Sequence, residues 1–519
     1  MNRTLKRLLV ALSLAALGSA SLAQGTQNTM TQYAYDAQGN LTTITDPRGF
    51  VTTRGFDALN RLIQIVQPPA TTGASNETTS IGYDGRGQIT SVTDPRSLLT
   101  QYTIDGLGNA MAQVSPDTGS TTRVFDAAGN LVSSTDSRGK LTTFAYDALN
   151  RLTTITYATG TATVLTYDGG SAPLPFDVGH LTTITDESGS TRIQYDAFGR
   201  IIMKTQITSG IGATAVTQSV QYVYGTGGAT NGKLIDVIYP SGAVLGYGFD
   251  QAGRISSIVV TRAVGGNTAV SSALVSNITY NPFGQPNGWI WGNGTPYSRT
   301  FDLDGRLAQY PIGAVAGSSP TPNSLIRTVD YDPASRIAAY IHSDASGNLN
   351  SVVAVAANQS FGFDNLNRIT SYSPAGTDLQ YAYDASGNRT SLTVGTTTYT
   401  DTIDPLSNRL LGTNGPTPAK TNTYDAAGNL KSDGAVTYTY SDRGRMASAQ
   451  TTSATVSYLY NGLGQRTLKV GPTSVVATGV NRYVYDEAGH LVGEYDSGGN
   501  LLQETVFLGD TPVTVLQTQ

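Results

Sequence analysis

A short motif built on an aromatic residue followed by aspartate recurs along almost the whole chain. One copy runs from Tyr35 to Leu41 and the next from Phe56 to Leu62, and each places Gly or Asn three residues after its aspartate. The residue before the aspartate, which we call the anchor, recurs every 21 residues over much of the chain, and longer intervals of 27 and 28 residues indicate loop insertions. Self-similarity at a fixed period of this kind is typical of repeat architectures, so we expect an array of small repeated units.

Each unit contains two turn signals. The first follows the anchor, and the second is seen as Asp-Pro-Arg-Gly at 46–49 and as Asp-Ser-Arg-Gly at 136–139. Two such turns leave room for two strands of about six residues, close to the usual strand length. Apolar side chains at the anchor and two residues before it, as in Phe144 and Tyr146, alternate with small or polar residues. One repeat is therefore predicted to be a β-hairpin, and the chain an all-β, long antiparallel meander with an aromatic ladder on one face.

The aspartate after each anchor is expected to build the turn. Its side chain can accept backbone N–H bonds from residues further on, and Gly or Asn at the fourth position tolerates the left-handed conformation. This structural role is favoured over a catalytic or calcium-binding one. The anchor pairs that we predict are Tyr35 and Asp36, Phe56 and Asp57, Tyr83 and Asp84, Tyr146 and Asp147, Tyr195 and Asp196, Tyr383 and Asp384, Tyr424 and Asp425, and Tyr485 and Asp486.

The first 23 residues are typical of a secretory signal peptide. Arg3, Lys6 and Arg7 precede an apolar run from Leu8 to Leu17, and small residues lead to an expected cleavage site after Ala23. The apolar run is shorter than the roughly 20 residues that cross a bilayer. We therefore expect an exported protein in the periplasm, at the cell surface or outside the cell, with no membrane span after cleavage.

The rest of the chain, 24–519, is predicted to be one repeat array. Regular units occupy 31–203 and 359–508, and a short tail covers 509–519. Between the regular parts, 204–358 is irregular, with segments rich in Gly, Ser, Ala and Thr at 208–217, 225–232, 263–276 and 312–324. We interpret these segments as loop insertions that leave the sheet.

Composition excludes several classes of function. Lys and Arg number 32 against 37 Asp and Glu, so the net charge of −5 offers no basic footprint for nucleic acid. No Cys is present, and the three histidines, His180, His342 and His490, form no constellation in the sequence. Nucleophile and phosphate-loop motifs are also missing. We expect no enzyme activity, no cofactor and no metal.

The Tyr-Asp units resemble those of the Rhs/YD-repeat family, as in Tyr-Asp-Ala-Leu-Asn-Arg-Leu at 146–152 and Tyr-Asp-Ala-Phe-Gly-Arg at 195–200. The resemblance covers about 31–508. It implies a sheet that spirals into a curved or hollow shell, which in polymorphic toxins encloses a toxic C-terminal segment. Related shells occur in insecticidal toxin complexes and teneurins.

Family members that carry a toxin continue into a core segment with an Asp-Pro self-cleavage motif. Here the repeats run through Tyr485 to Pro512 and the sequence stops at Gln519, so neither self-cleavage residues nor a toxin are carried over. We expect a shell wall, paired with a separately encoded core and toxin polypeptide or with other enclosed cargo, or else a remnant of such a protein.

A second hypothesis from a different class is a cell-surface adhesion or carbohydrate-binding module. Trp289 and Trp291, with Asn293 and Tyr297 nearby, form the one double-Trp patch, and aromatic rings stack against sugars. Filling of a seam in the shell is the competing interpretation, because aromatic side chains are usually buried. A cell-surface glycan is thus a possible partner, contacted by Trp289 and Trp291.

Overall fold

The structure is a computed structural model that describes residues 30–264, 268–312, 325–374, 376–415 and 418–517. In these ranges the chain forms 44 strands, one 3-10 helix at Gly228–Thr230 and one α-helix, α1 (Val352–Ala357). The strands form three antiparallel sheets in chain order. The first sheet runs from β1 (Gln32–Tyr35) to β23 (Pro296–Ser298), the second from β24 (Thr300–Phe301) to β34 (Lys420–Thr421), and the third from β35 (Thr423–Tyr424) to β44 (Thr511–Gln517). The prediction of an all-β antiparallel meander is confirmed.

The hairpins are built as three-to-five-residue turns with a bulge at the anchor. In the first hairpin the N–H of Asp36 donates to the Asn40 carbonyl at 3.0 Å, and the pairing of β1 with β2 (Leu41–Thr45) shifts between Ala34 and Tyr35. Gly39 takes a φ of 89°, and Asn60 takes 61° at the same place in the next hairpin. A left-handed residue in that position is what such a bulged loop requires.

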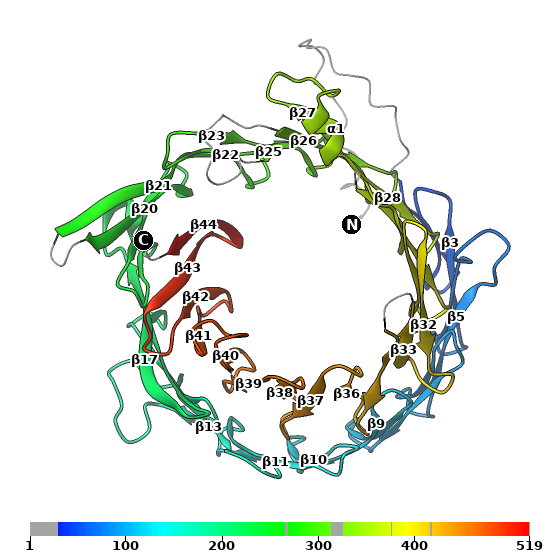
Figure 1. Ribbon diagram of the computed structural model, residues 1–519. Helices are drawn as coiled ribbons and strands as arrows, with labels where there is room; N and C mark the ends of the chain where they lie inside the picture. The colour runs from blue at the N-terminus through cyan, green and yellow to red at the C-terminus, as the bar shows by residue number, and fades with distance from the viewer. Residues whose placement is uncertain (1–29, 265–267, 313–324, 375, 416–417, 518–519) are drawn as a thin grey trace, which may run out of the picture.

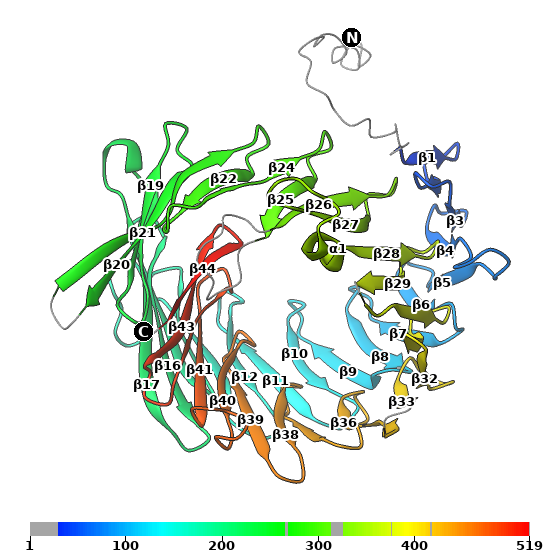
Figure 2. The same cartoon turned by 45° about the horizontal axis from the view of Figure 1, so that its top comes forward.

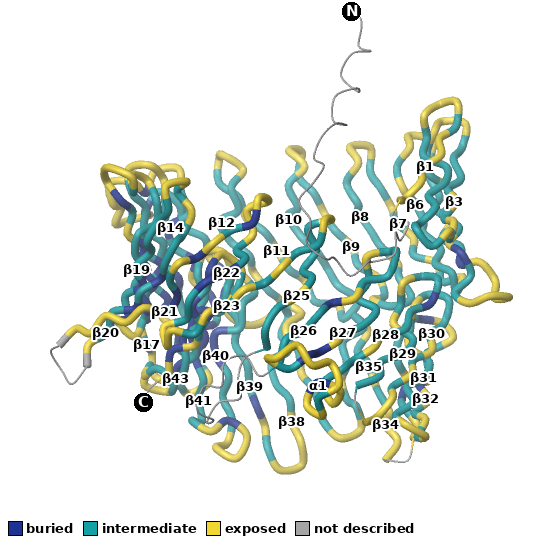
Figure 3. The backbone as a smooth tube through the Cα atoms, turned by 90° about the horizontal axis from the view of Figure 1, so that it is seen from above, coloured by how far each residue is buried: buried dark blue, intermediate teal, exposed yellow. Residues whose placement is uncertain are grey.

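The strip of hairpins curves into a ring (Figure 1), and no strand pairing among the described residues joins its first strand to its last. We call β1–β23 the first coil and β28 (Gln359–Phe363) to β44 the second coil; β24–β27 (Ile337–Asp344) form the arc between them. After one circuit the second coil runs beside the first (Figure 2). Figure 3 places the beginning of the second coil along one edge of the early strands of the first, so the strip spirals.

Most of the wall is one sheet thick. The chain exposes 28996 Å², whereas a globular protein of 54.4 kDa exposes about 18,000 Å². Side chains of a single layer are therefore mostly half-buried, as in β11 (Leu141–Tyr146), where exposed residues alternate with partly buried ones. Each hairpin depends on its neighbours, because a lone two-stranded unit is marginally stable.

A two-layer core forms where the coils overlap. There β41 (Val480–Tyr485) to β44 lie inside the ring against β17 (Ala213–Tyr224) to β22 (Pro286–Trp291), and the buried residues gather on that side (Figures 1 and 3). The core joins Leu245, Ile258 and Val275 of the first coil with Tyr495 and Val506 of the second.

Two of the predicted loop insertions are wrong. Most of 208–217 belongs to β16 (Ile201–Gly210) and β17, and most of 263–276 to β20 (Ile255–Val264) and β21 (Thr268–Tyr280). The end of the β16–β17 hairpin is contacted by Arg482 of the second coil, whereas the β20–β21 hairpin projects outward from the ring and its residues 269–273 are exposed (Figure 1). By contrast, 225–232 is irregular and holds the 3-10 helix. Nearly all of 312–324 lies outside the described residues.

The predicted signal peptide, 1–23, also lies outside the described residues. Of the helices in the part of the chain that the structure describes, none is long and apolar enough to cross a membrane.

Candidate functional site: the wall and the seam between its coils

Each turn after an anchor is closed by its aspartate. Oδ1 of Asp57 accepts the N–H groups of Leu59 at 2.9 Å and Arg61 at 3.0 Å, and its Oδ2 accepts Nε of Arg61 at 2.7 Å. These bonds to Arg61 lower the pKa of Asp57. In the first hairpin, Asn40 replaces the arginine and its Nδ2 donates to Asp36 Oδ2 at 2.9 Å.

The same arginine side chain also contacts the anchor of the next repeat. The guanidinium of Arg61 lies 4.7 Å from the ring centre of Tyr83, and the Tyr83 hydroxyl donates to the Leu62 carbonyl at 2.8 Å. A cation over an aromatic ring and a hydroxyl bonded to backbone thus join consecutive hairpins. Equivalent hydroxyl bonds run from Tyr146 to Leu131, Tyr195 to Leu181, Tyr383 to Ile369, Tyr424 to Leu410 and Tyr485 to Arg466.

The predicted anchor residues therefore lie at strand ends and their aspartates at turn starts, spread around the ring rather than gathered at one point. Tyr35 at the first hairpin is 62% exposed, while Phe56 is half-buried. Oδ1 accepts a backbone N–H in Asp84, Asp147, Asp196, Asp384, Asp425 and Asp486. Asp384 has a further contact, an ion pair at 3.3 Å with Arg96 of the first coil.

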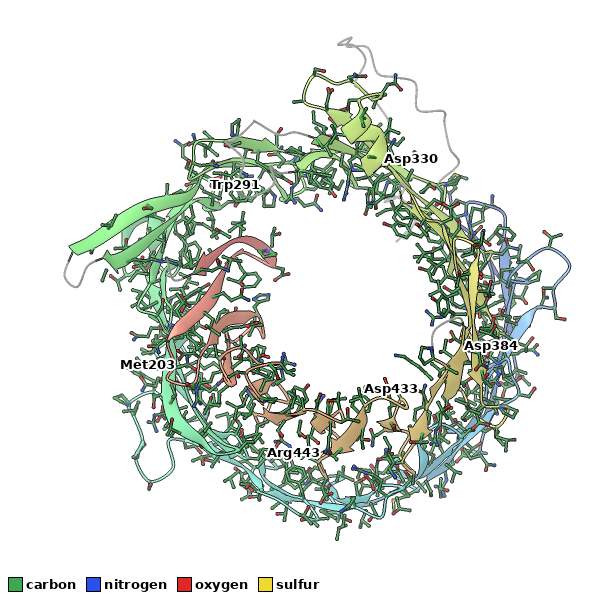
Figure 4. All side chains as sticks on the ribbon, viewed as in Figure 1. Met203, Trp291, Asp330, Asp384, Asp433 and Arg443 are labelled. Atoms are coloured by element: carbon green, nitrogen blue, oxygen red, sulfur yellow. The ribbon has the colours of Figure 1, made fainter. Side chains whose placement is uncertain are left out.

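The coils meet along a seam made of turns. The second turn of alternate units in the first coil carries an arginine, and that side chain reaches the anchor turns of the second coil. Arg48 donates to the carbonyls of Asp364 at 3.2 Å and Asn365 at 3.1 Å, Arg96 to Asp404 at 2.8 Å and Ser407 at 2.7 Å, and Arg138 to Ser441 at 3.1 Å. The labelled residues Asp384 and Arg443 belong to the second-coil side of this seam (Figure 4).

Contacts from the second coil complete the seam. Arg409 donates through Nε to the Asp117 carbonyl at 3.0 Å, and Arg443 forms an ion pair with Glu187 at 3.3 Å. Where the coils overlap, Lys204 of β16 is 5% exposed and its Nζ donates to the carbonyls of Tyr485 at 3.1 Å and Asp486 at 2.9 Å. Burial lowers the pKa of Lys204. Charged side chains that donate to backbone carbonyls thus join segments about 300 residues apart.

Sequence reasoning did not assign the seam arginines. It treated Arg48, Arg96 and Arg138 as turn residues, although each occupies the third position of an Asp-x-Arg turn. In the second coil, the corresponding turns at 433–436 and 451–454 contain no arginine. The presence of these arginines in the first half of the array and their absence from the second half indicates which edge of the first coil contacts the second coil.

The double-Trp patch is largely packed into the wall. Trp289 is 6% exposed, and its ring stacks on Tyr297 with centres 4.3 Å apart. Trp291 is partly buried and meets Trp289 edge-on at 5.4 Å. Trp289 belongs to the overlap core, so Trp291 is the more accessible of the two. Contact of this pair with a glycan stays a prediction.

The histidines are placed in three different settings. His180 stacks on Tyr195 at 4.2 Å between ring centres, and buried His342 accepts from Arg327 at 3.0 Å. His490 contacts Asp486 at 2.8 Å and Asp510 at 3.3 Å. Among the described residues, no group of three His, Asp or Glu side chains is arranged to hold a metal ion.

Comparison with known proteins places this wall among related folds. The RHS Repeat family model matches residues 21–51, 35–72, 125–162 and 177–214. No curated protein matches the chain. The crystal structure of TcdB2-TccC3 gives a TM-score of 0.69 at 14% identity, covering 95% of this chain and 32% of that one.

Two further solved structures agree. TcdB2-TccC3 without its hypervariable C-terminal region gives a TM-score of 0.67 at 14% identity, covering 94% of this chain and 30% of that one. The Photorhabdus luminescens Tc holotoxin pore with a mutated TccC3 gives 0.62 at 14% identity over 94% and 30%. This chain spans about a third of the length of the chains that it matches. The chain therefore contains Rhs repeats over the matched residues, and the described residues have the fold of an Rhs-type shell.

Proposed function

We propose that the chain forms the wall of an exported shell that encloses a polypeptide. The observation that carries this proposal is the seam, because it joins the edge of one coil to the edge of the next and makes a strip of hairpins into a continuous wall. The ring leaves its centre open when all side chains are drawn (Figure 4). A repeat array alone would serve equally well as an open ribbon.

The similar structures support a role in toxin delivery. One is a Tc holotoxin pore, and another was determined without a hypervariable C-terminal region. We propose that the cargo here is a polypeptide of the same general kind, and that residues 1–23 direct export with cleavage after Ala23. N-terminal sequencing of the secreted protein would check the cleavage site.

The enclosure itself is tested on the protein isolated from its native source. Electron microscopy is expected to show rings with an open or cargo-filled centre, and mass spectrometry to identify a co-purifying polypeptide. That polypeptide should resist added protease until the seam is opened by substitution of the seam arginines. A straight ribbon in the electron micrographs would contradict the proposal. So would a co-purifying polypeptide that protease digests at the same rate in the wild type and in the seam variant.

The alternative is a carbohydrate-binding module. It is supported by the aromatic cluster of Trp289, Trp291 and Tyr297, of which Trp291 is only partly buried. Binding of the chain to a glycan array would favour it, and the variants that separate it from a packing role are described in the Discussion.

A further inference from the structure

A pocket of about 480 Å³ lies where the second coil covers the inner face of the first. Its walls come from both coils: β17 to β20 on one side, and on the other the anchor turn 486–490 and the turn between β43 (Leu501–Leu508) and β44. The pocket is present only while the coils overlap. None of the seam arginines lines it.

The pocket walls are mainly aromatic and apolar. Tyr222, Tyr247 and Phe249 line it from the first coil and Phe507 from the second. Tyr222 is 5% exposed, and its hydroxyl has no hydrogen-bond partner of normal geometry, although burial and the nearby Glu487 carboxylate raise its pKa. Burial raises the pKa of Tyr247 to about 12, with the nearby carboxylates adding to the effect. Aromatic faces of this kind attract organic cations.

The charged groups at the pocket differ in whether they are already engaged. Lys233 lies 4.6 Å from the centre of the Phe249 ring, where other repeats place an arginine on the next anchor. Asp486 and Asp510 both contact His490. Glu487 lines the pocket as an exposed residue; among the described residues no cation lies within ion-pair distance of it, while the Tyr222 hydroxyl is beside it and Lys204 is within electrostatic range.

From this arrangement we infer that the pocket binds an organic cation with an apolar or aromatic body, with Glu487 facing the charge and the tyrosine rings packing on the body. Such a cation is either a free amine or the lysine or arginine side chain of an enclosed polypeptide. The second source rests on the proposed function, while the first does not. Either ligand would bridge the coils and stabilise their overlap.

Isothermal titration of the full chain tests this with three indole probes of similar shape and different charge. Tryptamine is expected to bind saturably and at least tenfold more tightly than uncharged tryptophol, while indole-3-acetate should not bind. Equal affinity for tryptophol, preference for indole-3-acetate, or absence of tryptamine binding would overturn the inference.

Variants show whether this pocket is the site. Glu487→Gln is expected to weaken tryptamine at least tenfold, whereas Glu494→Gln, a matched change that lies outside the pocket lining, should leave the affinity unchanged. Tyr222→Phe removes one oxygen without changing the packed ring and should weaken binding by a smaller factor. Unchanged affinity in Glu487→Gln would overturn the inference, and circular dichroism would confirm that each variant is folded.

A last titration distinguishes between a free amine and a polypeptide side chain as the ligand. The acetylated and amidated tripeptide Gly-Lys-Gly is titrated beside tryptamine. Binding of the tripeptide that is lost in Glu487→Gln identifies a polypeptide side chain as the ligand, and binding of tryptamine alone identifies a free amine. Because tryptamine binding needs no cargo, the inference about the pocket can be correct even if the enclosure proposal is wrong.

Discussion

Nη1 of Arg482 donates to the backbone carbonyl of Thr208 at 2.7 Å, across 274 residues of chain. Its Nη2 donates to the Thr214 carbonyl at 2.6 Å, so one side chain of the second coil holds both ends of the β16–β17 turn. Arg482 is fully buried, and among the described residues no carboxylate lies within ion-pair distance of it, although Asp496 is near enough to act on it electrostatically. Burial lowers its pKa. Backbone carbonyls thus replace water around a buried cation.

Removal of this cation should weaken the overlap of the coils. In Arg482→Met the apolar volume is largely kept, but the buried carbonyl of Thr208 and the more accessible carbonyls of Thr214 and Ser497 lose their donor, and loss of a buried partner costs about 1–3 kcal/mol. We expect the free energy of unfolding to fall by about 2–5 kcal/mol, measured by urea denaturation. Arg86→Met, at an exposed turn of the first coil, should stay within about 0.5 kcal/mol of the wild type. Equal midpoints for the two variants would show that the overlap does not depend on Arg482.

The seam arginines should control the shape of the molecule more than its secondary structure. Replacement of Arg48, Arg96 and Arg138 together by Gln shortens the side chain and removes its charge, so the bonds to the second coil are lost. We expect an unchanged far-ultraviolet circular dichroism spectrum and a larger radius of gyration in small-angle X-ray scattering, because the hairpins remain while the coils separate. Arg86→Gln is the matched control. An unchanged scattering profile would mean that the seam is held by the overlap core alone.

These residues also show how much of the structure can be predicted from the sequence. The roles of Asp57 in its turn and of Tyr83 in its strand could be predicted from the sequence, because turn chemistry and the alternation of apolar residues are local and repeat many times. Arg48 was not, since its partner Asp364 lies 316 residues away and only the pitch of the spiral brings them together. The strands β16, β17, β20 and β21 were mistaken in part for loops because Ser, Thr, Ala and Gly dominate them. Strand pairing at these positions is set by tertiary context, which local composition does not show: the end of β16–β17 meets the second coil, and β20–β21 extends an existing hairpin outward.

The two tryptophans should behave differently. Trp289→Ala empties a site in the overlap core, and loss of a buried Trp costs about 3–5 kcal/mol. Trp291→Ala, at a partly buried position, should lower the melting temperature less. If the chain binds a glycan through this patch, Trp291→Ala abolishes that binding on a sugar array at a temperature where the variant is folded. If the Trp291→Ala variant still binds the glycan, the two tryptophans have only a packing role.

Acid should unfold the array through its turn aspartates. Hydrogen bonds hold the folded pKa of Asp147 below its ordinary value of 3.8, so its contribution to stability is present above that value and is lost as pH falls toward the lowered pKa. Asp57, Asp105 and Asp126 are shifted in the same direction. We expect the melting temperature to fall steeply below about pH 4.

Asp147→Asn isolates one such turn. Asn281 naturally occupies this position in another repeat, and its Oδ1 accepts two backbone N–H groups at 3.0 Å. The variant should therefore keep the two backbone bonds of the turn, lose the bond from Arg151 Nε, and lose part of the acid dependence. An acid profile identical to the wild type would show that this carboxylate does not contribute.

His490 gives the opposite pH dependence at the end of the second coil. Its ring lies between Asp486 and Asp510 and stacks on Phe507 with centres 4.7 Å apart, so it ties the last anchor turn to the β43–β44 turn. The hydrogen bond to Asp486 and the two carboxylates raise its pKa above 6.5. Because the folded value is raised, the stabilisation is fully present below pH 6.5 and is lost as pH rises through the folded pKa.

We therefore expect faster hydrogen exchange, after correction for the intrinsic pH dependence, in β43 and β44 at pH 8.5 than at pH 6, with little change in β11 of the single-layer wall. The result follows because deprotonation removes both ion pairs and leaves the ring one N–H to donate, while the stacked ring remains. His490→Asn supplies the control, since Asn40 fills the equivalent slot in the first hairpin and does not titrate. This variant should exchange at the same corrected rate at both pH values. A wild-type protein whose terminal hairpin exchanges equally at pH 6 and pH 8.5 would show that His490 acts only through packing.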